Sequence, residues 1–253
     1  MKDKEKTAIQ LFRKLRALSP SLKGRAGVGS LILLLSACTS TAYDTGDSNY
    51  SYLRTDFVEA QTNSSGQLVS AVTDENTPLT FTQPLTIGWK TTADSLCRTM
   101  LYYKLNADDA DTTKIEPLTA QRVYTLIPAP VEEHATEAGG STQNNTLPTD
   151  PVQFVSAWKS RNGAFLNLCI GVMTGKTTGE DAVQGIGMAL DSIGRRTGHP
   201  VYYLRLVHSQ GSVPQYYTTN TYLSILTKSL PAGSTVRLSL NTYTGWVYRE
   251  FTW

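Results

Sequence analysis

The stretch VQFVSAWKSRNGAFLNLCI, residues 152–170, shows how the second half of this chain folds. Two apolar runs rich in β-branched and aromatic residues flank the turn cluster SRNG, residues 160–163. Such residues favour strands, and the turn cluster separates the two runs. The stretch therefore predicts two consecutive antiparallel strands.

The same pattern continues through residues 151–253. Seven strand-like runs alternate there with turn clusters such as GRRTGHP, residues 194–200, and LPAGS, residues 230–234. This spacing is typical of an antiparallel β-sandwich or barrel. One run, EDAVQGIGMALDSI at residues 180–193, fits a helix or a strand, and its two internal glycines favour the strand.

The first half of the chain is also rich in strand-like runs. Residues 50–129 hold about five of them, with no long amphipathic helical pattern. Residues 130–150, PVEEHATEAGGSTQNNTLPTD, have no hydrophobic period and are rich in Pro, Gly, Ser, Thr and acidic residues. They indicate a linker or a long exposed loop. The sequence thus predicts an all-β protein with two domains, at 50–129 and 151–253.

The N-terminal segment resembles an export signal. Residues 1–37 carry eight basic and two acidic residues, with an apolar run at 26–35 followed by Ser36 and Ala37. The run is shorter than the roughly 20 residues that a membrane-spanning helix needs. The motif LLSAC, ending at Cys38, resembles the lipobox of bacterial lipoproteins. That resemblance implies cleavage between Ala37 and Cys38 and a diacylglycerol on the Cys38 thiol.

Cleavage before Cys38 changes the charge of the protein. It removes eight of 23 basic and two of 21 acidic residues, so the remaining 216 residues carry a net charge of −4 instead of +2. The basic character belongs to the signal, and we expect no nucleic-acid partner. Residues 38–49 are predicted to be a flexible tether. We expect the acylated Cys38 to hold the protein in membrane lipid as an outer-membrane lipoprotein, with its side of the membrane left open.

Together these features resemble the NigD-like lipoproteins of Bacteroidales. The resemblance rests on the lipobox, a polar Tyr-bearing tether, a strand-rich first half and the hairpin residues Trp158, Gly163, Phe165, Leu166, Asn167 and Leu168. The acidic start common in the family is reduced here to Asp44 and Asp47. The resemblance implies an N-terminal OB-like barrel followed by a C-terminal β-sandwich. It implies no activity, and the family's link to a bacteriocin locus is too loose to imply immunity.

Besides Cys38 the chain has two cysteines, Cys97 and Cys169, each in an apolar strand-like run. An exported pair can form a disulfide. Two buried free thiols, which pack like small apolar residues, are the alternative that we favour.

The motifs for catalysis and for metal binding are missing from the sequence. There is no GxSxG motif. The histidines lack the spacing of zinc ligands; they are His134, His199 and His208. The acidic run Asp108, Asp109 and Asp111 lacks the Gly and Glu of an EF-hand loop. We therefore predict no catalytic residue, no metal site and no cofactor.

Three short patterns resemble the O-glycosylation sequon Asp-Ser/Thr-apolar. This sequon is used on exported proteins in Bacteroidales. Their acceptor residues are Ser95, Thr112 and Ser192.

The chain has thirteen tyrosines and four tryptophans, with tyrosine doublets such as 202–203. In a strand doublet one ring faces the core and the other faces out, where it can stack on a sugar or contact a protein. We predict a non-catalytic, lipid-anchored envelope protein that acts in binding or assembly, with a protein or glycan partner. The alternatives are a carbohydrate-binding accessory lipoprotein of a glycan-uptake system, which requires a row of exposed aromatic residues, a fimbrial or surface-fibre subunit, and a hydrolase.

Overall fold

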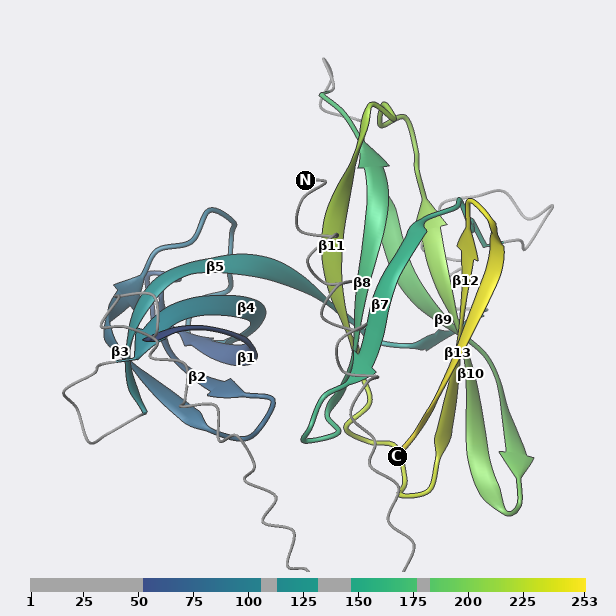
Figure 1. The fold of residues 1–253 in the computed structure, drawn as a ribbon, viewed down its shortest axis with the longest axis horizontal. Coiled ribbons are helices and arrows are strands. Elements are labelled where there is room, and N and C mark those ends of the chain that lie inside the picture. The colour runs from purple at the N-terminus through teal and green to yellow at the C-terminus, as the bar shows by residue number, and fades with distance from the viewer. Residues whose placement is uncertain (1–51, 106–112, 132–146, 177–182) are drawn as a thin grey trace, which may run out of the picture. The chain divides into compact units, whose positions relative to one another are not determined.

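The computed structural model describes residues 52–105, 113–131, 147–176 and 183–253 (Figure 1). These residues form thirteen strands, all within one unit, Gly46–Trp253. Within the described ranges, no helix has the length and apolar character needed to cross a membrane. The predicted signal, Ala37, Cys38 and the tether lie outside the described residues.

The first five strands form a small closed barrel. They are β1 (Leu53–Thr62), β2 (Leu68–Thr73), β3 (Pro78–Leu85), β4 (Leu96–Leu105) and β5 (Lys114–Leu126). The order β3-β2-β1-β4-β5 is closed by a parallel β3–β5 pairing. Val58, Leu68, Leu101 and Ile115 are fully buried inside, as alternation along each strand requires. This barrel matches the predicted OB-like architecture.

Strand β5 serves both the barrel and the sandwich. Its first part pairs with β4, up to Thr99↔Arg122. From Val123 to Leu126 it pairs in parallel with β11 (Tyr217–Leu226). The hydrogen-bonded sheet is therefore continuous from the barrel into β11, β8 (Phe165–Thr174) and β7 (Gln153–Lys159).

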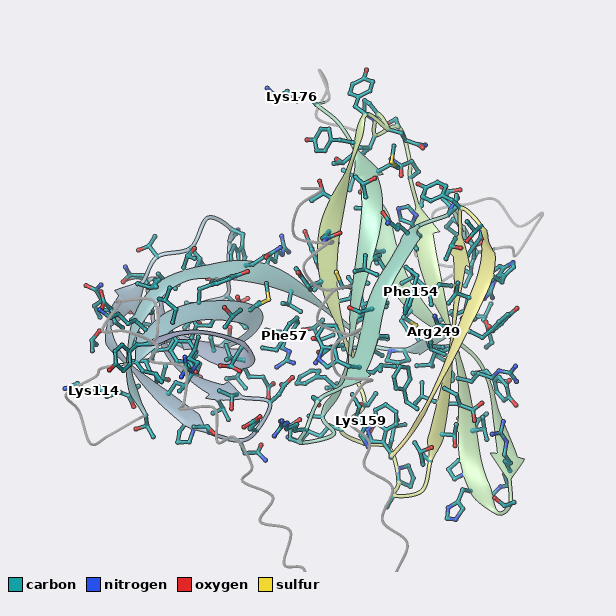
Figure 2. All side chains as sticks on the ribbon, viewed as in Figure 1. Phe57, Lys114, Phe154, Lys159, Lys176 and Arg249 are labelled. Atoms are coloured by element: carbon teal, nitrogen blue, oxygen red, sulfur yellow. The ribbon has the colours of Figure 1, made fainter. Side chains whose placement is uncertain are left out.

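A second sheet completes the sandwich. Its order is β13-β12-β10-β9-β6, formed by β13 (Gly245–Thr252), β12 (Thr235–Thr242), β10 (His199–Ser209), β9 (Gly185–Arg196) and β6 (Ala129–Pro130). Fully buried aliphatic residues of both sheets make one core; they include Leu168, Ile170, Leu223, Leu238 and Leu240. At the edge, the Arg249 guanidinium on β13 lies 4.6 Å from the ring centre of Phe154 on β7 (Figure 2).

The predicted all-β fold is confirmed. The hairpin at 152–170 forms β7 and β8, and the ambiguous run forms strand β9. In the sandwich, three pairs differ from the expected antiparallel pattern, because β5–β11, β6–β9 and β10–β12 are parallel. The chain reaches these positions by crossing between sheets: β11, which lies between β10 and β12 in sequence, belongs to the other sheet.

The end of the predicted linker is structured. Leu147 is buried with Ala189 and Val207, and Thr149 forms a parallel bridge with His208. The Asn241 side chain donates a hydrogen bond to the Thr149 carbonyl oxygen, 2.8 Å away. These contacts attach residues 147–150 to the five-stranded sheet.

Candidate binding face of the five-stranded sheet

The outer face of the five-stranded sheet gathers aromatic and charged side chains. Along β12, Val236, Leu238 and Leu240 are buried, so the alternate residues Arg237 and Ser239 point outward. Register with the neighbouring strands then decides which side chains lie beside them.

Two strands place aromatic rings on either side of β12. In the β12–β13 pairing, Ser239 lies opposite Tyr248 and Asn241 lies opposite Trp246. In the β10–β12 pairing, Arg237 lies beside Tyr203. Trp246 and Tyr248 are 45% and 54% exposed, which leaves much of each ring open to a ligand.

These residues enclose a shallow trough of about 400 Å³, which we call the aromatic trough. It is lined by Asp191, Tyr203, Arg205, Arg237, Ser239, Trp246 and Tyr248. The volume lies within the range of about 300–1,000 Å³ that is usual for small-ligand pockets. Ser239 lies between larger side chains, and its hydroxyl donates to the Leu204 carbonyl oxygen, 3.1 Å away.

Arg237 is positioned by both tyrosines. Its guanidinium carbon lies 5.9 Å from the Tyr203 ring centre and 5.7 Å from that of Tyr248. Both distances are within the range of cation–π attraction. This contact orders a cationic hydrogen-bond donor between two aromatic rings.

Two ion pairs each include one residue of β9, and the residues of the first, Asp191 and Arg205, line the trough. The Arg205 guanidinium donates three hydrogen bonds to Asp191, at 2.8–3.2 Å. Arg196 donates two hydrogen bonds to Glu250 on β13. The hydrogen bond from Arg196 lowers the pKa of Glu250 below its ordinary value, and the charges of Arg196 and Arg237 act in the same direction. Both carboxylates are therefore held by arginines through charge-assisted hydrogen bonds.

This combination of groups suits a carbohydrate. Aromatic rings pack on the apolar C–H faces of sugar rings, while arginine and carboxylate groups bind the hydroxyls in fixed directions. Side chains alternate between the two faces along each strand, so the residues of one face lie side by side across the sheet.

The two cysteines predicted as a candidate disulfide are both free thiols, so that alternative is wrong. Cys97 is half-buried on β4, where burial raises its pKa against the opposing effect of a hydrogen bond from Trp89. Cys169 is buried on β8, and its hydrogen-bond partner is Tyr222. The two thiols face different neighbours. Of the favoured alternative, two buried free thiols, both are free but only Cys169 is buried.

Two of the predicted glycosylation acceptors are described. Ser192 is exposed on β9. Ser95 precedes β4, and its hydroxyl donates to the Thr92 carbonyl oxygen, 2.9 Å away. Thr112 lies outside the described residues. Glycosylation at the three positions stays a prediction.

The described histidines are not brought together. His199 is exposed at the start of β10, whereas His208 is 1% exposed near its end, with Nδ1 3.0 Å from the Asp150 carbonyl oxygen. His134, Asp108, Asp109 and Asp111 lie outside the described residues. Among the residues that the structure describes, no cluster of His, Cys, Asp or Glu is arranged to hold a metal ion.

This chain is similar to known proteins in its structure. No protein-family model matches the chain, and no curated protein matches it in sequence. A solved NigD-like immunity protein from Bacteroides caccae superimposes with a TM-score of 0.57 at 19% identity, over 79% of this chain and 96% of that one. This chain has the NigD-like fold.

Two further Bacteroidales structures share the NigD-like fold. A candidate toxin-related protein from Parabacteroides distasonis gives a TM-score of 0.52 at 15% identity, over 80% of this chain and 92% of that one. A candidate lipoprotein from Bacteroides fragilis gives 0.50 at 13% identity, over 79% and 96%. The resemblance predicted from the sequence is thereby confirmed for the fold.

The aromatic trough was not predicted from the sequence. The tyrosine doublet at 202–203 was noted there, and its Tyr203 lines the trough. Arg237, Ser239 and Trp246 were missed because only strand register brings them onto the same face as Tyr203. The signal that could have pointed to them is alternation in β13, where Trp246 and Tyr248 share one face.

Proposed function

We propose that this NigD-like chain is a lipid-anchored, non-catalytic envelope protein that binds carbohydrate in the aromatic trough. The observation that carries the proposal is the grouping of Tyr203, Trp246 and Tyr248 around Arg237 and Ser239 on one face of a sheet. Trp246 and Tyr248 are exposed and Tyr203 is half-buried, which supports the carbohydrate-binding alternative with its requirement for exposed aromatic residues.

The electrostatics of the trough support this ligand class. Arg205 is paired with Asp191, so this part of the trough presents both donors and acceptors instead of an unbalanced charge. Sugar hydroxyls need both, because each hydroxyl donates one hydrogen bond and accepts others. Arg237 adds a donor that is held between two rings before the ligand arrives, which reduces the entropy lost on binding.

The membrane anchor is supported by the sequence and by one similarity. The motif LLSAC at 34–38 matches a lipobox, and a candidate lipoprotein from Bacteroides fragilis shares the fold. A tethered binding domain would retain a captured glycan at the envelope. Placement in the outer membrane is part of this proposal.

The proposal is tested by glycan-array screening of the full chain, followed by calorimetry with the best oligosaccharide. Trp246→Ala should weaken binding at least about tenfold, since loss of one aromatic stacking contact costs roughly 1–3 kcal/mol. Ser239→Trp should also abolish binding, because it fills the trough without removing a contact group.

The control for these variants is Tyr216→Ala. Tyr216 is 76% exposed but does not line the trough, so its removal should leave affinity unchanged. Retained affinity in both Trp246→Ala and Ser239→Trp would refute the trough as the binding site. Failure of the full chain to bind any glycan on the array would instead favour a role in protein assembly.

A further inference from the structure

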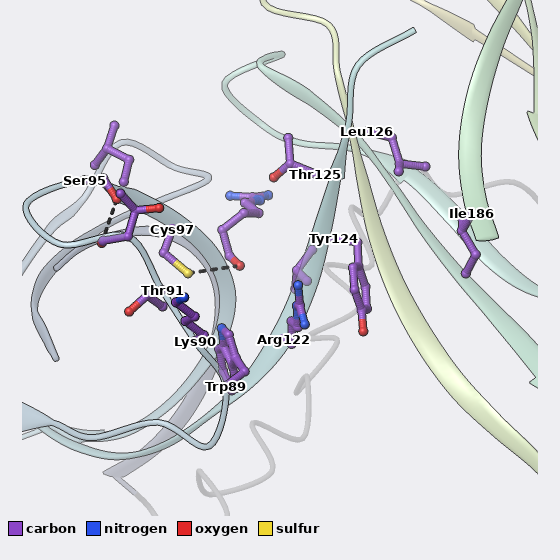
Figure 3. A pocket seen from close by; sticks show the side chains of 14 residues that line it. Trp89, Lys90, Thr91, Ser95, Cys97, Arg122, Tyr124, Thr125, Leu126 and Ile186 are labelled. Carbon is purple, nitrogen blue, oxygen red and sulfur yellow. Dashed lines mark hydrogen bonds between the residues drawn. The ribbon is translucent and has the colours of Figure 1, made fainter. Parts of the chain in front are cut away.

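A second pocket lies on the barrel, away from the aromatic trough. Its volume is about 380 Å³, and its fourteen lining residues come from the β3–β4 loop, the start of β4, the end of β5 and Ile186 (Figure 3). Trp89 and Lys90 lie on the loop, and Arg122 and Tyr124 lie on β5. We call this the barrel pocket.

The loop that carries Trp89 and Lys90 is fixed by hydrogen bonds. The Thr62 hydroxyl donates to the Thr92 carbonyl oxygen, 2.7 Å away, and accepts from the Ser95 N–H, 2.9 Å away. Thr62 itself is 1% exposed. One residue before Thr92, the Thr91 hydroxyl donates a hydrogen bond to the Gly66 carbonyl oxygen, 2.9 Å away. The wall of the pocket is therefore preorganised, which favours a binding role.

The charge of the barrel pocket is positive. Lys90 and Arg122 are exposed cations, and none of the fourteen lining residues is acidic. A third cation, Arg98, is buried, and its charge is compensated by Asp74 at 2.7 Å. The pocket thus offers Lys90 and Arg122 to an anion.

Aromatic rings accompany these cations. The Arg122 guanidinium carbon lies 4.4 Å from the ring centre of Tyr124, a stacking contact that orders the side chain. Trp89 is close enough to Cys97 to hydrogen-bond its thiol. A ligand here would meet an aromatic surface and two cations together.

We propose that the barrel pocket is a second binding site, for the carboxylate of an acidic sugar. Arginine suits a carboxylate because its planar fork can bind both oxygens, and Trp89 and Tyr124 can pack on the adjoining sugar ring. This inference rests on a different set of residues from the aromatic trough and does not require the trough to bind.

A nucleic-acid strand fits the surroundings less well. The described barrel residues, 52–105 and 113–131, contain six acidic and six basic residues, so the barrel has no excess of positive charge. A strand of phosphates needs a continuous basic groove, whereas one carboxylate needs only the local pair of Lys90 and Arg122.

Cys97 provides a direct test, because it lines the pocket while Cys169 is buried elsewhere. The full chain carrying Cys38→Ser is treated with N-ethylmaleimide, and the Cys97 adduct is followed by peptide mass spectrometry. Trigalacturonic acid should slow modification of Cys97 at least about fivefold at saturation. Its methyl ester, which has the same ring shape without charge, should give little protection.

Variants then assign the anion contact. Arg122→Gln and Lys90→Gln should each raise the concentration of trigalacturonic acid that gives half-maximal protection about tenfold, as expected for loss of one charge-assisted hydrogen bond. The matched controls are Lys228→Gln, an exposed cation that lines neither pocket, and Trp246→Ala in the trough; both should leave protection unchanged.

Three results would overturn the inference. One is equal protection by the methyl ester, and another is full protection in both Arg122→Gln and Lys90→Gln. The third is protection by inorganic phosphate or oligo-dT as strong as by trigalacturonic acid, which would point to a phosphate ligand. Loss of trough binding alone would leave this result unaffected, so the two proposals fail separately.

Discussion

The Arg98 guanidinium and the Asp74 carboxylate form an ion pair 2.7 Å apart, with side chains 3% and 16% exposed. Arg98 also donates hydrogen bonds to Ser224 on β11, at 3.1 Å, and to Asn167 on β8, at 3.2 Å. Its guanidinium carbon lies 4.1 Å from the Phe165 ring centre. One buried cation on β4 thus joins the barrel to two strands of the sandwich.

Removal of Asp74 should be strongly destabilising. Asp74→Ala leaves the buried Arg98 charge unpaired, which typically costs about 3–5 kcal/mol. It also removes the acceptor of the Asn167 side-chain amide, 3.1 Å away. Urea denaturation should show this loss in the free energy of unfolding.

The neighbouring residue provides a matched control. Glu75 forms an ion pair with Arg161 at 3.1 Å, but these side chains are 56% and 79% exposed. Glu75→Ala should change stability by less than about 1 kcal/mol, as is usual for surface ion pairs. Equal losses of unfolding free energy in the two variants would show that the buried Arg98–Asp74 pair stabilises the protein no more than the exposed pair does.

Gly66→Ala should destabilise the barrel and disturb its pocket. Gly66 has φ of +75°, and an added Cβ would lie 2.9 Å from the Thr91 hydroxyl oxygen. The left-handed backbone alone costs a non-glycine residue about 1–2 kcal/mol, and the clash adds to this. Gly198→Ala has φ of +87° with open space around the Cβ, so it isolates the backbone effect. A loss in Gly66→Ala no larger than in Gly198→Ala would contradict the clash.

The thiols should react slowly at neutral pH. Burial raises the pKa of both Cys97 and Cys169 above the ordinary value of 9.0, so little thiolate is present at pH 7.5. Alkylation of Cys97 should accelerate as pH rises past 9, while the 3%-exposed Cys169 should react only on unfolding. Mass spectrometry of iodoacetamide adducts with and without urea measures both rates. Fast alkylation of folded Cys97 at pH 7 would contradict the raised pKa.

The raised pKa of Cys97 also affects how the free energy of unfolding depends on pH. A raised pKa in the folded state means that the folded protein favours the neutral thiol. The stabilising contribution is therefore complete below the unfolded pKa and declines as pH rises through the folded value. Cys97→Ser should reduce this decline in alkaline urea titrations.

Local sequence patterns predicted most of the strands. The hairpin at 152–170 and strand β9 follow from turn residues and β propensity, which act over a few positions. The parallel β5–β11 and β10–β12 pairs do not, because partners such as Tyr222 and Val123 are far apart in sequence. Single-sequence periodicity shows which face a residue takes, and not which strand lies beside it.

The candidate sites were harder to predict for the same reason. The trough depends on β13, β12 and β10 aligning Tyr248, Ser239 and Arg205 across the sheet. The barrel pocket depends on Arg122 and Trp89 meeting around Cys97. None of these residues belongs to a contiguous motif. The thirteen tyrosines and four tryptophans led us to expect exposed aromatic residues, and Trp246 and Tyr248 are exposed.

The predicted lipid anchor on Cys38 can be tested by metabolic labelling. Cys38 lies outside the described residues, and the expectation rests on LLSAC at 34–38 behind a basic, apolar N-terminus. Cells fed an alkyne analogue of palmitate should label the wild-type protein in the membrane fraction. Cys38→Ala should remove the label, because the thioether bond needs that sulfur, whereas Cys97→Ala should retain it. Label and membrane association that persist in Cys38→Ala would disprove the anchor.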